Sequence, residues 1–237
     1  MISMMLLQNF YKETARLKLR VNSLMTTTLD SSIAEHLVLL HPVSWETFNQ
    51  LLAELGDQRN KRLAYYQGTL EIMSPLGKHE NSNRFIESLI SVIADELNLN
   101  IKKFGSLTLN SQHQGVEPAS CYYIKNEFRV RSQQNIDLEI DPPPDLVLEV
   151  DMTSGSLNKL PIYANFRVPE FWQYDGEKLT VFLLEEASNT YQEVNQSKLF
   201  PFLDFKQIPQ LIQHSLEIGE TATLKQFRQW VRENAEQ

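Results

Sequence analysis

The sequence has little cysteine, no long apolar run and no excess of positive charge. A single thiol, Cys121 among 237 residues, cannot form a disulfide framework or a cysteine-cluster metal site, and it indicates a reducing, cytoplasmic environment. Apolar runs such as Leu37–Leu40 and Val181–Leu184 are too short to span a bilayer, so we expect no membrane association. The formal net charge of −8 argues against a generally basic surface for nucleic acid.

The composition is that of a globular chain, with 42% hydrophobic and 10% aromatic residues, and the length is ample for a packed core. Residues 1–28 differ, because they carry four basic residues against one acid. They are interpreted either as a flexible arm or as an over-extended gene start, with Met25 in place of Met1 as initiator. We expect an α/β domain over residues 29–195 and a helical segment over residues 196–237 that packs on it.

Hydrophobic periodicity predicts a mixed α/β fold with one mixed sheet flanked by helices. A helix should begin at the N-cap Ser44 and end at Gly56, and a second should run from His79 to Leu97. A hairpin is expected over Arg62–Met73, turning at Gln67 and Gly68. Strands are predicted at Ile101–Leu109, Cys121–Ile124, Leu146–Val150, Phe171–Tyr174, Leu179–Leu184 and Tyr191–Val194. Residues 152–168 and the chain from Ile208 onwards are predicted to be helical.

The most informative stretch is an acidic strand that follows three prolines, Pro142–Pro144. Alternation places Leu146, Leu148 and Val150 on one face, and Asp145, Val147, Glu149 and Asp151 on the other. Glu149 and Asp151 are two residues apart, so their carboxylates can converge on one cation. Hard oxygen ligands suit Mg²⁺, Mn²⁺ or Ca²⁺.

Structural roles are open for the same acids. Asp151 could cap a following helix, and Asp145 could bind only the backbone of a nearby loop. Lys159, eight residues beyond Asp151, is placed in a helix that should pack back on the strand. There it could orient a water and offset charge on a pentavalent phosphorus, or it could be an ordinary exposed lysine.

Several ordered motifs extend this pattern along the chain. They are Tyr66–Pro75 with His79, Gly115–Pro118, Asp145–Val150, Thr153-Ser154, Lys159, Tyr163-Ala164, Val168–Trp172 and the C-terminal Phe227–Trp230. Together they resemble the Uma-type restriction endonuclease family over about residues 40–235. That family is similar to PD-(D/E)xK nucleases, whose core is a mixed sheet flanked by helices.

The resemblance implies metal-dependent cleavage of DNA phosphodiester bonds, with Mg²⁺ (or Mn²⁺) as cofactor. In such nucleases an Asp and a Glu bind the metal, and a Lys assists the attacking water. Carried over, Glu149 is the strand carboxylate and Lys159 a lysine displaced to the following helix. Asp151 stands where the ordinary strand lysine would be, and Glu80 is the additional acid at the start of the long helix. The resemblance also gives a homodimer as an expectation, because nucleases that cut both strands often dimerise.

One departure from the family pattern matters, because Ala119 follows Pro118 where the family has the first metal-binding Asp. Either Asp145, Glu117 or Asp151 compensates, or the chain is a catalytically degenerate module that binds nucleic acid or protein without cleavage. A third alternative is a hydrolase that uses Glu149 and Asp151 as acid and base on another substrate.

Basic residues could border a DNA cleft or form an ordinary solvated face. The substrate-binding candidates are Lys102, Lys103 and Arg129, and further basic groups lie at Arg59, Lys61, Arg62, Lys125 and Arg131.

Overall fold

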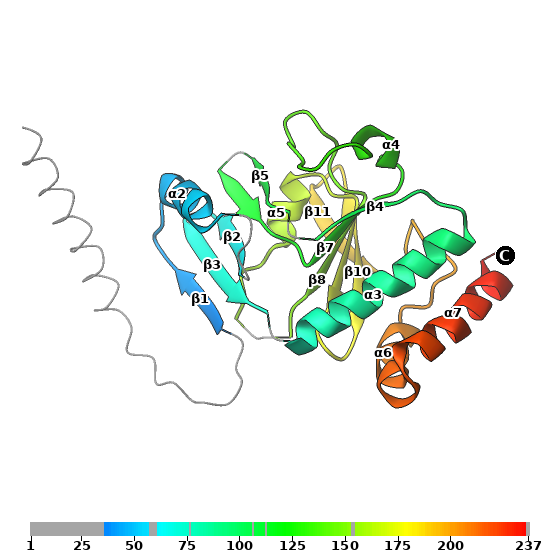
Figure 1. The fold of residues 1–237 in the computed structure, drawn as a ribbon. Coiled ribbons are helices and arrows are strands. Elements are labelled where there is room, and N and C mark those ends of the chain that lie inside the picture. The colour runs from blue at the N-terminus through cyan, green and yellow to red at the C-terminus, as the bar shows by residue number, and fades with distance from the viewer. Residues whose placement is uncertain are drawn as a thin grey trace, which may run out of the picture. The chain divides into compact units, whose positions relative to one another are not determined.

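The computed structural model describes residues 36–56, 61–75, 77–105, 107–111, 113–152 and 155–235. The predicted N-terminal arm, with both candidate initiators Met1 and Met25, lies outside these ranges. The described residues form a mixed α/β fold, which confirms the predicted class, but the strands divide between two sheets and not one (Figure 1).

The first sheet is antiparallel throughout, with strand order β1-β3-β2-β6-β5. Its strands are β1 (His36–Leu40), β2 (Arg62–Tyr66), β3 (Thr69–Ser74), β5 (Leu109–Ser111) and β6 (Gln114–Val116). The predicted hairpin is β2–β3, and it turns at Gln67 and Gly68 as expected, both with positive φ. A two-residue turn of this kind needs φ above zero, which Gly68 adopts at no steric cost.

The second sheet is mixed, with strand order β11-β10-β9-β8-β7-β4 and one parallel pair, β8–β9. Its strands are β4 (Lys102–Phe104), β7 (Ser120–Tyr123), β8 (Leu146–Val150), β9 (Glu170–Tyr174), β10 (Leu179–Glu185) and β11 (Thr190–Val194). The helices are α2 (Trp45–Leu55), α3 (Gly77–Glu96), α4 (Glu127–Val130), α5 (Leu160–Asn165), α6 (Gln207–Ile218) and α7 (Glu220–Asn234).

Both faces of β8 are covered, so every residue of this central strand is buried. Leu146, Leu148 and Val150 belong to a core with the apolar face of α3. Val147 belongs to a separate core with residues of α5. The predicted alternation of the strand is therefore confirmed, and it places Glu149 on the α5 face.

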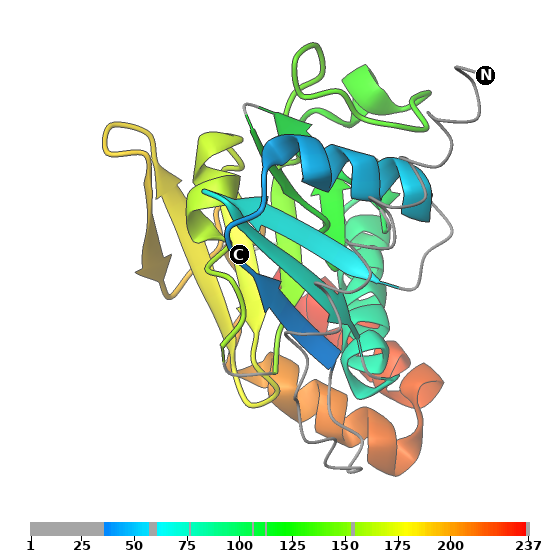
Figure 2. The ribbon, with the colours of Figure 1, turned by 90° about the vertical axis from the view of Figure 1, so that its left-hand side faces the viewer.

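The first sheet is covered by α2, whose Ser44 cap accepts a hydrogen bond from the Thr47 amide at 3.1 Å. In Figure 2, α2 (blue) lies across the strands of the hairpin (cyan). Phe48 is fully buried in this layer and stacks on Tyr65. Gly115 of β6 lies directly beneath, because a Cβ there would come within 2.8 Å of the Phe48 ring.

Two predicted elements are wrong in extent. The predicted strand Ile101–Leu109 is two strands in different sheets, because the chain bends at Gly105 and leaves the second sheet. The predicted helix over residues 152–168 is the six-residue α5, and Lys159 is its N-cap and not an internal residue. Pro161, in the first turn of α5, has no amide hydrogen and is best tolerated at a helix start.

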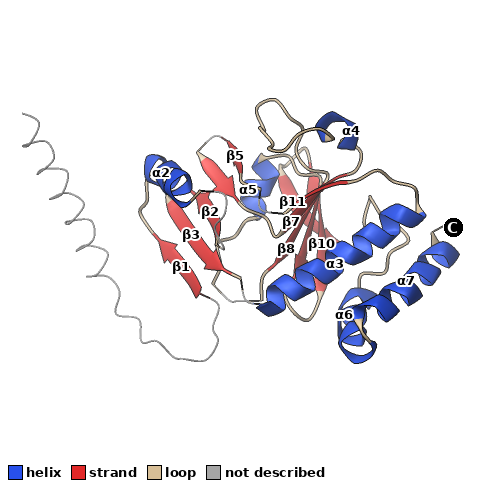
Figure 3. Cartoon of the chain, viewed as in Figure 1, coloured by secondary structure: helices blue, strands red, loops and turns tan. Residues whose placement is uncertain are grey.

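The C-terminal helices α6 and α7 pack beside α3, which runs along the second sheet (Figure 3). Glu96, at the end of α3, is ion-paired with Arg228 and Arg232 of α7. Among the described residues, no helix is both long enough and apolar enough to cross a membrane.

Candidate functional site

Glu149 and Lys159, the two residues that the sequence singled out most strongly, meet at the end of β8. The Lys159 Nζ lies 3.6 Å from the Glu149 Oε2, and both side chains are buried. Tyr163, one turn further along α5, donates a hydrogen bond of 2.5 Å to the Glu149 Oε1. The Oε2 accepts no hydrogen bond from the described residues. One oxygen of Glu149 is thus fixed by a hydroxyl, and the other faces the ammonium alone.

Glu71 of β3 completes this group, and no role was predicted for it. Its Oε1 lies 3.2 Å from the Lys159 Nζ, and its Oε2 accepts a hydrogen bond of 2.6 Å from the Leu157 amide. Glu71 belongs to the first sheet and Glu149 to the second, so Lys159 lies between acids of both sheets. The sequence signal that could have identified Glu71 is an acid inside an otherwise apolar hairpin strand, where a charge needs a partner.

The charges of the group act on one another. Burial by itself would lower the pKa of Lys159, but Glu149, Glu71 and Asp151 outweigh it, and the pKa is raised. Burial raises the pKa of Tyr163, and the neighbouring Glu149 raises it further, so this hydroxyl keeps its proton and can donate. Three carboxylates around one ammonium leave the group with an excess of negative charge.

Asp151 lies at the open end of β8 and is half-buried. Ser156 donates a hydrogen bond to its carboxylate, and its charge acts on Lys159. The described residues give no sign that Asp151 caps a helix, because α5 begins only at Leu160.

Asp145 does not join this group, so its prediction as a metal ligand beside Glu149 needs correction. Its Oδ2 accepts hydrogen bonds from the amides of Ile124 (2.7 Å) and Asn126 (3.1 Å), and its Oδ1 accepts one from the Asn126 side chain (3.1 Å). These donors lie at the other end of β8, next to the proline segment. Asp145 therefore has the backbone role that the sequence left open for it.

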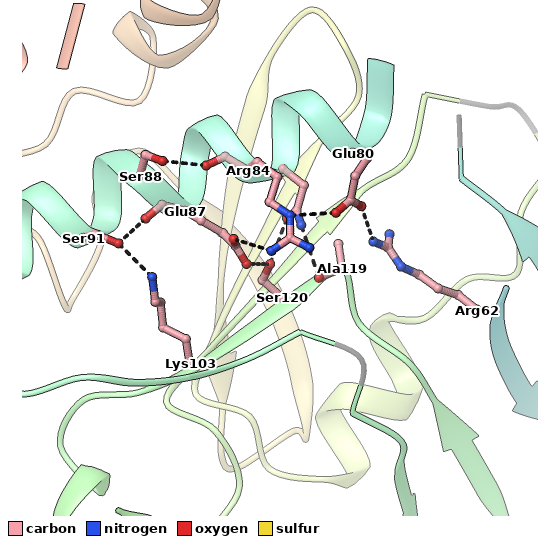
Figure 4. A network of polar contacts seen from close by, with 10 residues as sticks. Arg62, Glu80, Arg84, Glu87, Ser88, Ser91, Lys103, Ala119 and Ser120 are labelled. Carbon is pink, nitrogen blue, oxygen red and sulfur yellow. Dashed lines mark hydrogen bonds and ion pairs between the residues drawn. The ribbon is translucent and has the colours of Figure 1, made fainter. Parts of the chain in front are cut away.

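Glu80 also lies outside the group. It belongs to the first turn of α3 and forms ion pairs with Arg62 (3.1 Å) and Arg84 (2.8 Å), as Figure 4 shows. Glu117, one of the candidates to replace the missing Asp, accepts hydrogen bonds from the Leu63 amide (2.8 Å) and the Thr108 hydroxyl (2.6 Å). It is held in a structural role directly after β6, against the neighbouring strand β2.

The predicted substrate-binding residues lie on β4 and α4. Lys102 lies over the Phe104 ring and donates to the Arg131 carbonyl, and Lys103 donates to the Ser91 hydroxyl at 3.0 Å. Arg129 is exposed on α4. None of the three contacts the Glu149–Lys159 group in the described structure, and their role in binding DNA stays a prediction.

Ala119 lies in the bend before β7, and its carbonyl accepts a hydrogen bond of 3.3 Å from Asn83 of α3. β7 and β8 are antiparallel, with Ser120 opposite Leu148. Ala119 directly precedes this ladder, and its side chain packs in the core on the α3 face, whereas Glu149 lies on the α5 face. In the ranges that the structure describes, no group of three or more His, Cys, Asp or Glu is arranged to hold a metal ion.

The fold and the buried carboxylate–lysine pair are accompanied by a family match. The Uma2 family model, described as "Putative restriction endonuclease", matches residues 45–219. This is more than half of the chain, so the chain belongs to that family, and the predicted resemblance is confirmed.

Among solved structures, the crystal structure of a "putative nuclease belonging to DUF820" from Anabaena variabilis is similar to this chain. The two share 15% sequence identity with a TM-score of 0.46, over 77% of this chain and 99% of that chain. No curated protein matches the sequence.

Proposed function

We propose that this chain is a nuclease that hydrolyses DNA phosphodiester bonds with Mg²⁺ or Mn²⁺, with Glu149 and Lys159 at its centre. The observation that carries the proposal is the pair itself: a strand carboxylate and a lysine from the following segment lie 3.6 Å apart. Membership of a family described as restriction endonucleases supports DNA as the substrate.

The donor set fits a divalent cation by its charge and chemistry. Glu71, Glu149 and Asp151 all act on the one Lys159 ammonium, so carboxylates outnumber cations in the group. The Glu149 Oε2 is buried and accepts no hydrogen bond from the described residues, and hard carboxylate oxygens are the ligands that Mg²⁺ and Mn²⁺ prefer. Glu149 and Asp151 would hold the ion. When bound, it would stabilise charge on the phosphate and lower the pKa of a water.

The protein's own side chains supply positioning and charge. Tyr163 fixes the orientation of Glu149 through one carboxylate oxygen. Glu71 holds Lys159 from the first sheet and also binds the Leu157 amide, so the segment before α5 is fixed at two points. The Lys159 ammonium, kept charged by its acidic neighbours, can donate a hydrogen bond to an attacking water or to a phosphate oxygen.

The test is nicking of supercoiled plasmid in Mg²⁺ or Mn²⁺ by the wild type and by Glu149→Gln. Loss of a central carboxylate should lower the rate at least ~100-fold, by analogy with the loss of other transition-state contacts. Glu193→Gln, an exposed acid of β11, is the matched control and should leave the rate unchanged. Equal nicking by the wild type and Glu149→Gln would refute the proposal.

Ala119 favours a second candidate function, a non-cleaving module that keeps the nuclease fold and binds nucleic acid. The substitution Ala119→Asp separates the two candidates, because it restores the acid that the family pattern has at this position. If metal-dependent nicking is absent in the wild type and present in Ala119→Asp, the natural chain is the binding module.

A further inference from the structure

A pocket of about 690 Å³ lies between the first sheet, α3 and the bend before β7. Its wall includes three cationic side chains, Lys61, Arg62 and Arg84, and it also includes Ala119. Three positive groups from two segments of the chain, Lys61-Arg62 and α3, therefore surround one open space that Ala119 also borders.

Within this pocket a single carboxylate bridges the two arginines. Glu80 lies 3.1 Å from Arg62 and 2.8 Å from Arg84, and Arg84 also reaches Glu87 at 3.3 Å (Figure 4). A guanidinium carries more N–H donors than these contacts use. Two arginines that share one anion can also bind a phosphate group. In this pocket the carboxylate of Glu80 takes the place that the larger phosphate would occupy.

The other acid of the pocket wall does not compete for the arginines. Both oxygens of Glu117 accept hydrogen bonds, one from the Leu63 amide and one from the Thr108 hydroxyl. Glu80, by contrast, is more than one-third exposed at its side chain. It can be displaced from Arg62 and Arg84 without uncovering the core.

We propose that Arg62 and Arg84 form a binding site for a backbone phosphate of nucleic acid, and that Glu80 occupies this site in the free protein. The assignment to nucleic acid rests on the proposed function, and the anion site itself rests on the pocket. A phosphate held there would lie beside Ala119, which belongs to the wall of the same pocket. Glu80 acts as an internal competitor that a phosphate displaces.

The experiment measures the Kd of a short fluorescent DNA duplex by anisotropy in the presence of a chelator, so that no cleavage occurs. Glu80→Gln should bind about fivefold more tightly than the wild type, since removing one unit charge a few ångströms from an exposed phosphate changes the energy by about the Coulomb term in water. Arg62→Gln and Arg84→Gln should bind more weakly. Inorganic phosphate should displace the duplex from the wild type at lower concentration than from Arg62→Gln.

The chain offers a close control in Glu96, which also bridges two arginines, Arg228 and Arg232, but lies outside the pocket. Glu96→Gln frees the same amount of positive charge elsewhere, so any general gain in DNA affinity appears there as well. Thermal melting of each variant verifies that it is folded.

Equal affinities of Glu80→Gln and Glu96→Gln would overturn the proposal, as would weaker binding by Glu80→Gln. Binding of inorganic phosphate without binding of the duplex would overturn the assignment to nucleic acid. If the affinities follow the expected order but plasmid nicking is the same in Glu149→Gln as in the wild type, the nuclease proposal fails and the phosphate site stands. A catalytic role for Glu80 gives the opposite pattern, with slower cleavage and unchanged binding.

Discussion

Replacing Lys159 with methionine removes the ammonium that lies between two buried carboxylates. Glu71 and Glu149 are 1% and 2% exposed, so water cannot replace the lost partner. Methionine has a similar length and fills the space without restoring the charge. Removing one member of a buried ion pair typically costs about 3–5 kcal/mol, because the remaining charge stays buried without compensation. We expect a loss of this size in the free energy of unfolding of Lys159→Met at pH 7.

The distances support the magnitude. At 3.2 and 3.6 Å and an effective dielectric constant of about 20, each contact is worth about 5 kcal/mol of Coulomb energy before desolvation is counted. Most of this Coulomb energy offsets the cost of burying the ammonium group. The variant has no ammonium and therefore does not incur that cost. A net loss of a few kcal/mol therefore remains.

The assay is urea denaturation followed by tryptophan fluorescence, with buried Trp172 as an internal reporter. The double variant Lys159→Met/Glu71→Gln removes one carboxylate with its partner and should recover a substantial part of the loss. If the single variant does not fold, the stability of the double variant relative to Glu71→Gln provides the comparison. A loss below about 1 kcal/mol in the single variant, or no recovery in the double variant, would refute the reasoning.

Three further outcomes are expected. The pKa of Lys159 is raised from its ordinary value of 10.5. The stability that the charged lysine contributes is therefore complete below pH 10.5 and is lost as the pH rises through the higher pKa of the folded protein. Denaturation curves from pH 7 to 12 should show the stability of the wild type approaching that of Lys159→Met only above about pH 10.5. Tyr163→Phe removes a hydrogen bond to a buried carboxylate and should cost about 1.5–3 kcal/mol in the same assay, with unchanged stability as the contrary result. Gly115→Ala forces a methyl group against the Phe48 ring and should lower the free energy of unfolding by about 1–3 kcal/mol. Gly77→Ala is the control, because its new methyl group meets nothing within 4 Å and should not destabilise the protein. Equal melting temperatures of the two variants would contradict the packing described.

The acidic strand shows what the sequence can predict. The alternation of β8 correctly separated the α3 face from the α5 face, because a two-residue period is a local property of any strand. It also identified Glu149, since a charge in a strand this apolar needs a partner. Lys159 was placed near that strand by its position eight residues beyond Asp151, and the family resemblance gave it the same place; α5 begins one residue later, so Lys159 is its N-cap and not an internal residue.

The contacts from the first sheet could not be predicted in the same way. Glu71 lies 88 positions before Lys159 in the chain, and only the packing of one sheet against the other brings the two together. The role of Asp145 depended on where the chain turns after β7, which supplies the amides of Ile124 and Asn126. Periodicity gives the face of a strand on which an acid lies, but not the donors that the rest of the fold brings to it.

α3 links two regions that are far apart in the fold. Its first turns carry Glu80 and Arg84 at the pocket, and its last turn carries Glu96, bound by α7. Glu80 and Glu96 are 16 positions apart in this 20-residue helix, about 24 Å along its axis, and the helix between them is buried along one side. Occupancy of the pocket and the docking of the C-terminal helix consequently act on one rigid body. The helix that borders the pocket is thus also the helix on which α7 docks.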